Sequence, residues 1–391
     1  MYLDQLIGQG GDIISWVVWI IFFMIFFMFY PRMMLSQIMW KLEASARRLE
    51  TMSSESRKFV LGSISKKPDK KTRESVDRFF EFFMITPVDL DPSGIVKKLD
   101  HVIRNERDRF NYFTQQIMPD AGEETKANIQ MGMAAGIELY MIAKIVRHYI
   151  ETIKKTKSYQ IAMIIQMQLP IIERIAKSLL EGTKTLARGQ PIGDGIGPWM
   201  IASMIDKEKT HEVAEDIIAA EKKMDGRHLF LVKAKGPGGR IGYPGKAVDA
   251  LIRKKKVAKV ITIDAAAKLE GEKTGSVAEG VGIAMGGPGV ERSYIEDAVV
   301  RNNIPMDSIV VKMSAEEAIM PMRMSMIKSQ ADVLDSIKRS IERTKKGDRV
   351  IVVGVGNTSG VGNNAGDAEK TRKWVDGYEK KLKAAKKKKA D

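Results

Sequence analysis

The chain has 391 residues, of which 44% are hydrophobic, so it can bury at least one substantial core and is long enough for two or three structural units. It contains no cysteine, which excludes disulfides, a thiol nucleophile and a zinc site of the cysteine type. Its four histidines form no HxxxH or HxH pair, so we expect no histidine-rich metal site, and we expect no other metal site and no cofactor either. The net charge of +15 is large, but no aromatic residues alternate with the basic ones and no reader motif occurs, so we expect no specific nucleic-acid recognition.

The first predicted element is a hydrophobic helix at residues 13–30. These residues carry no charge, have Ser15 as their only polar side chain and would span about 27 Å as a helix, which is enough to cross a bilayer. Asp12 precedes the segment, whereas Arg32 and Lys41 follow it, and these flanks do not suit a cleaved signal peptide. The positive-inside rule therefore predicts a single-pass cell-membrane protein with its N-terminus outside and its bulk in the cytoplasm. A buried core helix is the alternative, although such helices seldom lack a polar face.

Residues 33–188 are predicted to form a helical domain. The pattern is amphipathic from Met33 to about Arg57 and breaks at the KKPDKK run of residues 66–71. Pro170 is expected to kink or divide the last helix. Methionines at helical spacing are typical of adaptable cores or oligomer interfaces, so we expect a homo-oligomer or a protein partner here. The later helices are predicted at residues 75–84, 95–113, 126–156 and 158–186.

Beyond Gly189, short apolar runs alternate with helical stretches. This alternation is typical of a three-layer α/β domain with a mostly parallel sheet. The lysine-rich end, Glu379–Asp391, is either a solvated, disordered tail or a contact with anionic lipid. The predicted strands are residues 228–233, 257–264, 308–312 and 349–354. The predicted divisions are an anchor at 1–32, a helical domain at 33–188, the α/β domain at 189–366 and the basic tail at 367–391.

Glycine-rich or acidic turns follow several of the predicted strands. In open α/β sheets, ligands bind at the carboxyl ends of the strands, which is where these turns are expected. A glycine loop between a strand and a helix can bind a phosphate group. However, neither GVGNTSGVGNN nor GPGGRIGYPGK has the GxxxxGK[ST] spacing of a phosphate loop, so we do not predict a nucleotide.

Five of these motifs, taken in order, resemble those of the bacterial spore germination protease and, more distantly, those of hydrogenase-maturation peptidases. The resemblance covers about residues 189–317. It is carried by Asp194-Gly195-Ile196-Gly197-Pro198, Lys235-Gly236-Pro237-Gly238, Ile263-Asp264-Ala265-Ala266-Ala267, Gly287-Pro288-Gly289-Val290-Glu291 and Asn303-Ile304-Pro305. The whole chain also resembles an uncharacterised family of archaeal single-pass membrane proteins.

The chain departs from these peptidases in one respect. Their aspartate turn is preceded by a strand ending in Gly-x-Gly-Asn. In this chain the corresponding motif lies near the C-terminus, at residues 350–357 (VIVVGVGN). We therefore predict a circular permutation that brings this last strand beside Asp194. The resemblance further implies that Asp194 and Asp264 are catalytic. It implies a substrate-binding loop set of Gly236, Gly238, Gly287, Gly289, Gly354, Gly356 and Asn357.

Two neighbouring carboxyl groups suit hydrolysis without a metal. Both cannot ionise easily, so one remains an acid while the other activates water. The alternative roles are structural: Asp194 would cap the helix that Pro198 opens, and Asp264 would accept backbone N–H groups at a strand end. The replacement of a Gly-Asn pair by Val290-Glu291 departs from the peptidase pattern. The predicted function is a membrane-anchored, hydrolase-like protein that cleaves cytoplasmic polypeptides, and the alternative is a non-catalytic, membrane-anchored oligomeric scaffold or partner-binding protein.

Overall fold

The computed structural model describes residues 3–82, 84 and 94–390. The chain packs as two compact units, and each is described by itself. Unit 1 comprises Met1–Ser53 and Tyr140–Ala176, and unit 2 comprises Ser54–Leu139 and Lys177–Asp391. Three long helices contribute residues to both units: α1 (Leu3–Ile64), α4 (Glu123–Thr156) and α5 (Tyr159–Ala187). The domain boundaries predicted from composition stay predictions.

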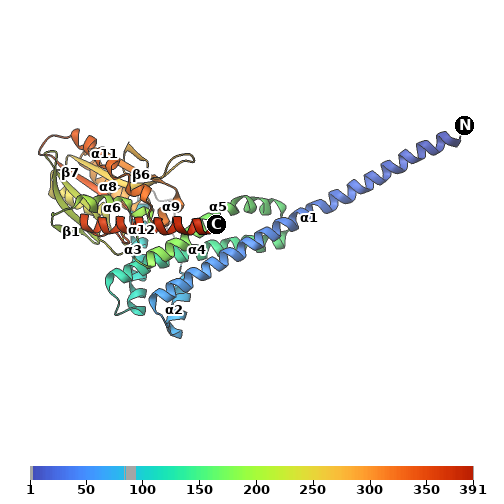
Figure 1. Ribbon diagram of the computed structural model, residues 1–391, viewed down its shortest axis with the longest axis horizontal. Coiled ribbons are helices and arrows are strands. Elements are labelled where there is room, and N and C mark those ends of the chain that lie inside the picture. Colours follow the sequence, from blue (N-terminus) through green and yellow to red (C-terminus); the bar gives the residue numbers. More distant parts are fainter. Residues whose placement is uncertain (1–2, 83, 85–93, 391) are drawn as a thin grey trace. The chain divides into compact units, whose positions relative to one another are not determined.

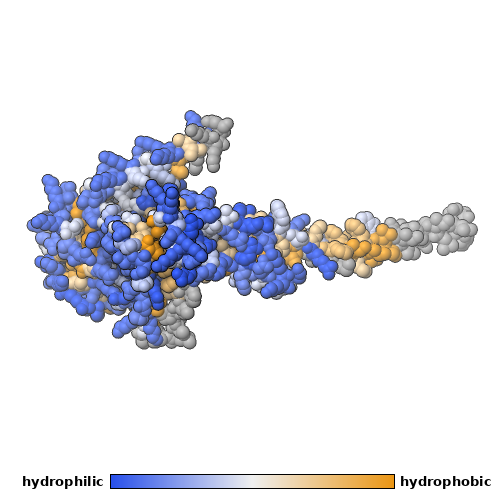
Figure 2. Space-filling model, turned by 90° about the horizontal axis from the view of Figure 1, so that it is seen from below, coloured by the Kyte–Doolittle hydropathy of each residue, from blue (hydrophilic) through white to orange (hydrophobic). Residues whose placement is uncertain are grey.

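Unit 1 consists of helical segments. Helix α1 passes without a break through the apolar stretch, whose side chains from Trp16 to Phe27 are exposed and form the orange length of the helix in Figure 2. Further along α1, Arg147 of α4 pairs with Glu43 at 2.8 Å and with Glu50 at 2.6 Å. These ion pairs fix α4 against the charged part of α1.

Two helices among the described residues are long and apolar enough to cross a membrane. They are residues 16–64 of α1, whose most apolar window is not buried, and residues 123–156, whose apolar window is half buried. Buried core helices share such length and composition, so the membrane span of α1 stays a prediction. Pro170 was predicted to kink or divide the helix; α5 continues through it, so a division is wrong, and the kink stays a prediction. Pro170 is exposed, and water can therefore satisfy the carbonyl that its missing N–H leaves free.

Unit 2 adds two shorter helices, α2 (Lys70–Phe80) and α3 (Ile95–Ile117). The predicted break after α1 is present, and α2 begins five residues earlier than predicted because Asp69 caps it by accepting the N–H of Thr72 at 2.8 Å. The described part of unit 2 then forms one seven-stranded sheet (Figure 1). Its strands are β1 (Thr210–Ala214), β2 (Ile217–Met224), β3 (Arg227–Ala234), β4 (Lys259–Ala267), β5 (Val277–Val281), β6 (Met306–Met313) and β7 (Arg349–Gly354).

The strand order is β1-β2-β3-β7-β4-β6-β5. The four central strands β3, β7, β4 and β6 pair in parallel, and they are the four strands predicted from the sequence. The outer strands β1, β2 and β5 pair antiparallel and were not predicted. Their solvent-facing residues interrupt the apolar runs by which buried strands are recognised.

Helices cover both faces of this sheet, so unit 2 contains the predicted three-layer α/β arrangement. One face packs against α6 (Ile196–Met204), α10 (Met324–Ile327), α11 (Gln330–Glu342) and α12 (Ala365–Ala390). The other face packs against α7 (Pro244–Lys254) and α8 (Val290–Arg301). The last strand in sequence, β7, is inserted between β3 and β4, so its end meets the turns that follow earlier strands.

The lysine-rich end does not form a disordered tail within the described residues. Helix α12 continues to Ala390, and lysines such as Lys380 and Lys381 are exposed along it. Asp391 lies outside the described residues. Lysine is a good helix former, and this favours continuation of the helix beyond the packed residue Val375.

Candidate functional site

Asp194 lies in a single 3-10 turn, Gly193–Gly195, that leads directly into α6. The helix begins at Ile196, so Pro198 is its third residue and does not open it as predicted. The start of α6 lies against the end of β7: a Cβ atom on Gly354 would be 2.3 Å from the carbonyl oxygen of Gly197. Close backbone packing therefore places the Asp194 turn at the carboxyl end of the inserted strand.

The loop after β7 contacts Asp194 directly. The backbone N–H of Asn357 donates to Asp194 Oδ2 at 2.8 Å. Gly356 has a φ of +131°, and a Cβ atom there would be 2.0 Å from the carbonyl oxygen of Asp194. Three of the predicted loop residues, Gly354, Gly356 and Asn357, thus lie beside Asp194 although more than 150 positions separate them in sequence.

Asp264 lies on β4 one residue beyond the last pair that β4 makes with β7, which joins Ile263 to Gly354. The strand does not end at Asp264, as predicted, but continues to Ala267 by pairing with β6. Asp264 is only 4% exposed. Its Oδ1 accepts the N–H of Ala265 at 2.7 Å, and its Oδ2 accepts the N–H of Gly286 at 3.2 Å.

The two aspartates interact electrostatically. Burial raises the pKa of Asp264 to about 8, and the negative charge of Asp194 contributes to this rise against the two backbone N–H groups. Burial also raises the pKa of Asp194, although the N–H of Asn357 opposes the shift. Asp194 nevertheless retains some accessible surface, whereas Asp264 is enclosed. The structure therefore brings the two predicted residues together at the carboxyl edge of the central strands.

The remaining predicted loop residues fall into two groups. Gly236 exchanges hydrogen bonds with the Asn363 side chain at 2.9 and 2.8 Å, and the carbonyl of Gly238 accepts the Thr358 hydroxyl at 2.7 Å. These two glycines pack the loop after β3 against the loop after β7.

The second group adjoins Asp264 through Gly286. Gly287 and Gly289 have φ values of +79° and +85°, and a Cβ atom on either would meet no atom within 4 Å. This glycine segment thus presents open backbone next to the carboxyl group of Asp264.

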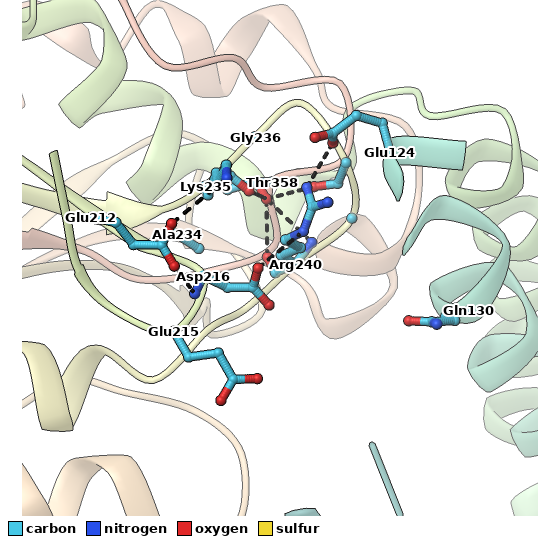
Figure 3. Close-up of polar contacts among 12 residues, drawn as sticks. Glu124, Gln130, Glu212, Glu215, Asp216, Ala234, Lys235, Gly236, Arg240 and Thr358 are labelled. Carbon is cyan, nitrogen blue, oxygen red and sulfur yellow. Dashed lines mark hydrogen bonds and ion pairs between the residues drawn. The ribbon is translucent and has the colours of Figure 1, made fainter. Parts of the chain in front are cut away.

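A pocket of about 860 Å³ elsewhere in unit 2 was not predicted from the sequence. Its walls come from α3, α4, the turn between β1 and β2, the loop after β3 and the start of α8. Figure 3 shows its polar edge, where Arg240 points toward Glu124 and Asp216, at 2.6 and 3.3 Å. Neither Asp194 nor Asp264 lines this pocket.

Several groups near this pocket form a charged cluster around Tyr243. The guanidinium of Arg107 lies 4.8 Å from the centre of the Tyr243 ring and the ammonium of Lys246 lies 4.2 Å from it. Asp100 accepts two hydrogen bonds from Arg104 at 3.1 Å. No sequence motif marks this cluster, because its members come from segments more than 100 positions apart. Within the described residues, no group of three or more histidine, aspartate or glutamate side chains is placed to hold a metal ion.

Comparison with known proteins gives two family matches. Residues 16–189 match the model described as the N-terminal domain of a protein of unknown function (DUF1512), and residues 192–362 match the model described as the C-terminal domain of unknown function (DUF1512). No curated protein and no solved structure matches the chain. Because the two models together cover most of the 391 residues, the chain belongs to the DUF1512 family.

Proposed function

We propose that this protein is a membrane-anchored hydrolase that cleaves peptide bonds with the pair Asp194 and Asp264. The observation that carries the proposal is a pair of interacting carboxyl groups at the carboxyl edge of a parallel sheet, both with raised pKa values. Buried carboxyl groups with perturbed pKa values at such an edge are typical of functional sites. In this proposal α1 holds the chain in the membrane and the bulk of the protein faces the cytoplasm.

The chemistry follows from the different environments of the two groups. With a pKa of about 8, Asp264 is protonated at neutral pH and is the general acid. Asp194 is the general base: it takes a proton from water, and the hydroxide attacks the carbonyl carbon. Asp264 then gives its proton to the amine nitrogen as the C–N bond breaks. The products are a carboxylic acid and an amine. The reaction requires two carboxyl groups in different environments, so that one is protonated while the other is ionised.

The glycine segment beside Asp264 is the proposed binding surface for the polypeptide. Gly286 already donates its N–H to Asp264 at 3.2 Å, and the open backbone at Gly287 and Gly289 leaves room for an extended chain. The opposite side of the proposed binding surface is formed by the Asp194 turn. This turn is held in place by Gly354, Gly356 and Asn357. Gly236 and Gly238 support the adjacent loop.

The position of β7 supports a relation to the germination protease and hydrogenase-maturation peptidases by circular permutation. In this proposal the last strand of the chain takes the place of their first strand. The N–H of Asn357 contacts Asp194, and β7 pairs with β4, the strand that carries Asp264. Both contacts are expected if β7 supplies the missing Gly-x-Gly-Asn strand.

The test is cleavage of a diverse library of unfolded peptides by the full-length protein in lipid nanodiscs, with new termini identified by mass spectrometry. Asp194→Asn and Asp264→Asn should each abolish cleavage while thermal unfolding remains cooperative. Asp206→Asn is the control, because Asp206 is exposed and follows the end of α6 opposite to the end that Asp194 precedes. Absence of new termini with the wild type, or equal cleavage by either variant, would overturn the proposal.

A specific observation favours the second candidate, a non-catalytic oligomeric scaffold. In unit 1, an apolar face of α5 is exposed, and patches of this kind mark protein interfaces. Sedimentation of the full-length wild type and of Met167→Glu tests the role of this face. Dissociation of the variant into monomers would support assembly through α5, and an unchanged mass would refute it. The exposed members are Tyr159, Met163, Ile164, Met167 and Ile171.

We also propose that the lysines of α12 contact anionic lipid. Their exposed positions, such as Lys380, Lys381 and Lys383, suit attraction to a negatively charged surface. Flotation of the full-length protein with Lys380→Gln, Lys381→Gln and Lys383→Gln should show weaker binding to added phosphatidylserine vesicles than the wild type, and equal binding would refute the contact.

A further inference from the structure

The pocket in unit 2 has the size of a small-molecule site. Its volume of about 860 Å³ lies within the range of about 300–1,000 Å³ that binds drug-sized ligands. Much of its wall is apolar, and it combines this wall with a few converging polar groups. The apolar wall includes Ile103, Phe110, Ala127, Met131, Ala134 and Val290.

The cations that line the pocket already have partners. Arg107 pairs with Asp216, and Arg240 pairs with Glu124 at 2.6 Å and with Asp216 at 3.3 Å. The ammonium of Lys126 donates to a glutamine of the wall at 2.7 Å. Since these groups are satisfied within the protein, the pocket offers an incoming anion little free positive charge.

Two carboxyl groups of the pocket lack such partners. Glu291 accepts the N–H of Gly245 with Oε2 at 2.7 Å, but its Oε1 is buried and has no hydrogen-bond partner. Glu106 makes no hydrogen bond or ion pair with any residue that the structure describes. Burial raises the pKa of Glu106 and raises that of Glu291 to about 7, so each carboxylate is held in an environment that disfavours its charge.

We propose that this pocket binds an organic cation, whose amine is recognised by the carboxyl groups of the wall, Glu291 and Glu106 among them, and whose apolar body lies along α3 and α4. A bound ammonium places a positive charge beside carboxylates that burial disfavours, and it so stabilises their charged form. The apolar wall buries the body of the ligand. This inference does not depend on the hydrolase proposal, because neither aspartate of that site lines the pocket.

The experiment compares three probes that share one aromatic body and differ in the charge of the head group. Tryptamine is the cation, tryptophol the neutral probe and indole-3-acetate the anion. Isothermal titration of the full-length protein in nanodiscs should give at least about tenfold tighter binding of tryptamine than of tryptophol, and no measurable binding of indole-3-acetate. Glu106→Gln and Glu291→Gln should each remove most of that preference.

Two further variants separate a lost site from a lost fold. Ala134→Phe fills the pocket without removing a charge and should abolish binding of tryptamine. Asp297→Asn, on the same helix as Glu291 but not on the pocket wall, should bind like the wild type. Asp194→Asn should also leave binding unchanged, so failure here is distinct from failure of the hydrolase.

Equal affinity for the three probes, or tighter binding of indole-3-acetate, would overturn the proposal. So would a dissociation constant for tryptamine above about 1 mM. Retention of the full cation preference by both glutamate variants would also contradict it, because the carboxyl groups would then not recognise the amine.

Discussion

The raised pKa of Asp264 predicts a pH dependence of stability that runs opposite to ordinary acid denaturation. In the folded protein the pKa is about 8, against an ordinary value of 3.8, so the folded state binds the proton more tightly than the unfolded state. The contribution of this group is therefore fully present below pH 3.8 and is lost as pH rises to 8. The full shift corresponds to about 6 kcal/mol, of which about 4 kcal/mol falls between pH 5 and pH 8.

Asp264→Asn removes the titration and should flatten this dependence. The absolute stability of the variant also reflects its amide, since both carboxyl oxygens of Asp264 accept backbone N–H groups and an amide NH2 cannot. The informative quantity is therefore the change in the free energy of unfolding between pH 5 and pH 8, measured by denaturant titration of the full-length protein in detergent. The wild type should lose about 4 kcal/mol more than the variant over this range.

Asp194→Asn supplies the internal check on this reasoning. The charge of Asp194 contributes to the raised pKa of Asp264, so its removal should lower that pKa and reduce the loss of stability at pH 8. Identical pH dependence in the wild type and Asp264→Asn would refute the raised pKa. Identical dependence in the wild type and Asp194→Asn would refute the coupling of the two groups.

Three further predictions concern two buried ammonium groups and the close backbone contact between β7 and α6. Burial lowers the pKa of Lys233 from 10.5 to about 7, so Lys233→Met should raise the free energy of unfolding at pH 7 by up to about 4 kcal/mol, less the contribution of the lost hydrogen bonds. This gain should shrink as pH rises to 10.5. Asp307→Asn removes the negative charge 2.7 Å from the buried ammonium of Lys259 and should destabilise by about 3–5 kcal/mol in denaturant titration. Gly354→Ala places a Cβ atom 2.3 Å from a carbonyl of α6 and should lower the melting temperature, whereas Gly286→Ala, with open space at its Cβ, should change it little.

The central part of the fold could be predicted from the sequence because its strands contain mainly apolar runs. Val350–Val353 and Ile261–Ile263 are fully buried or nearly so, and such runs stand out from the charged helices around them. The outer strand β2 combines a buried half at Ile217–Ala220 with the charged Glu221 and lysines that follow, so no single period describes it. Propensity and pattern therefore identified the parallel core and missed the antiparallel strands.

The same distinction applies to the candidate sites. The turns at Asp194 and Asn357 contain glycines that the local backbone geometry requires, so a sequence motif marks each of them. No sequence motif marks the pocket. Glu106 lies on one helix and Glu291 at the start of another, with no motif at either position. Only the packing of α3 against α8 brings these carboxyl groups to one cavity, and that packing is a tertiary property.

The energetics of Asp264 bear on the choice between a catalytic and a structural role. A structural role is satisfied by the two backbone N–H groups that this carboxyl group accepts, and hydrogen bonds to a charged group contribute about 1.5–3 kcal/mol each. These bonds favour the charged form, yet burial and Asp194 still raise the pKa to about 8. A residue that only satisfied backbone donors would need no second carboxyl group nearby, because the neighbour's charge opposes its own ionisation. The coupling to Asp194 therefore favours the catalytic proposal, because that reaction requires two carboxyl groups of which only one carries a proton.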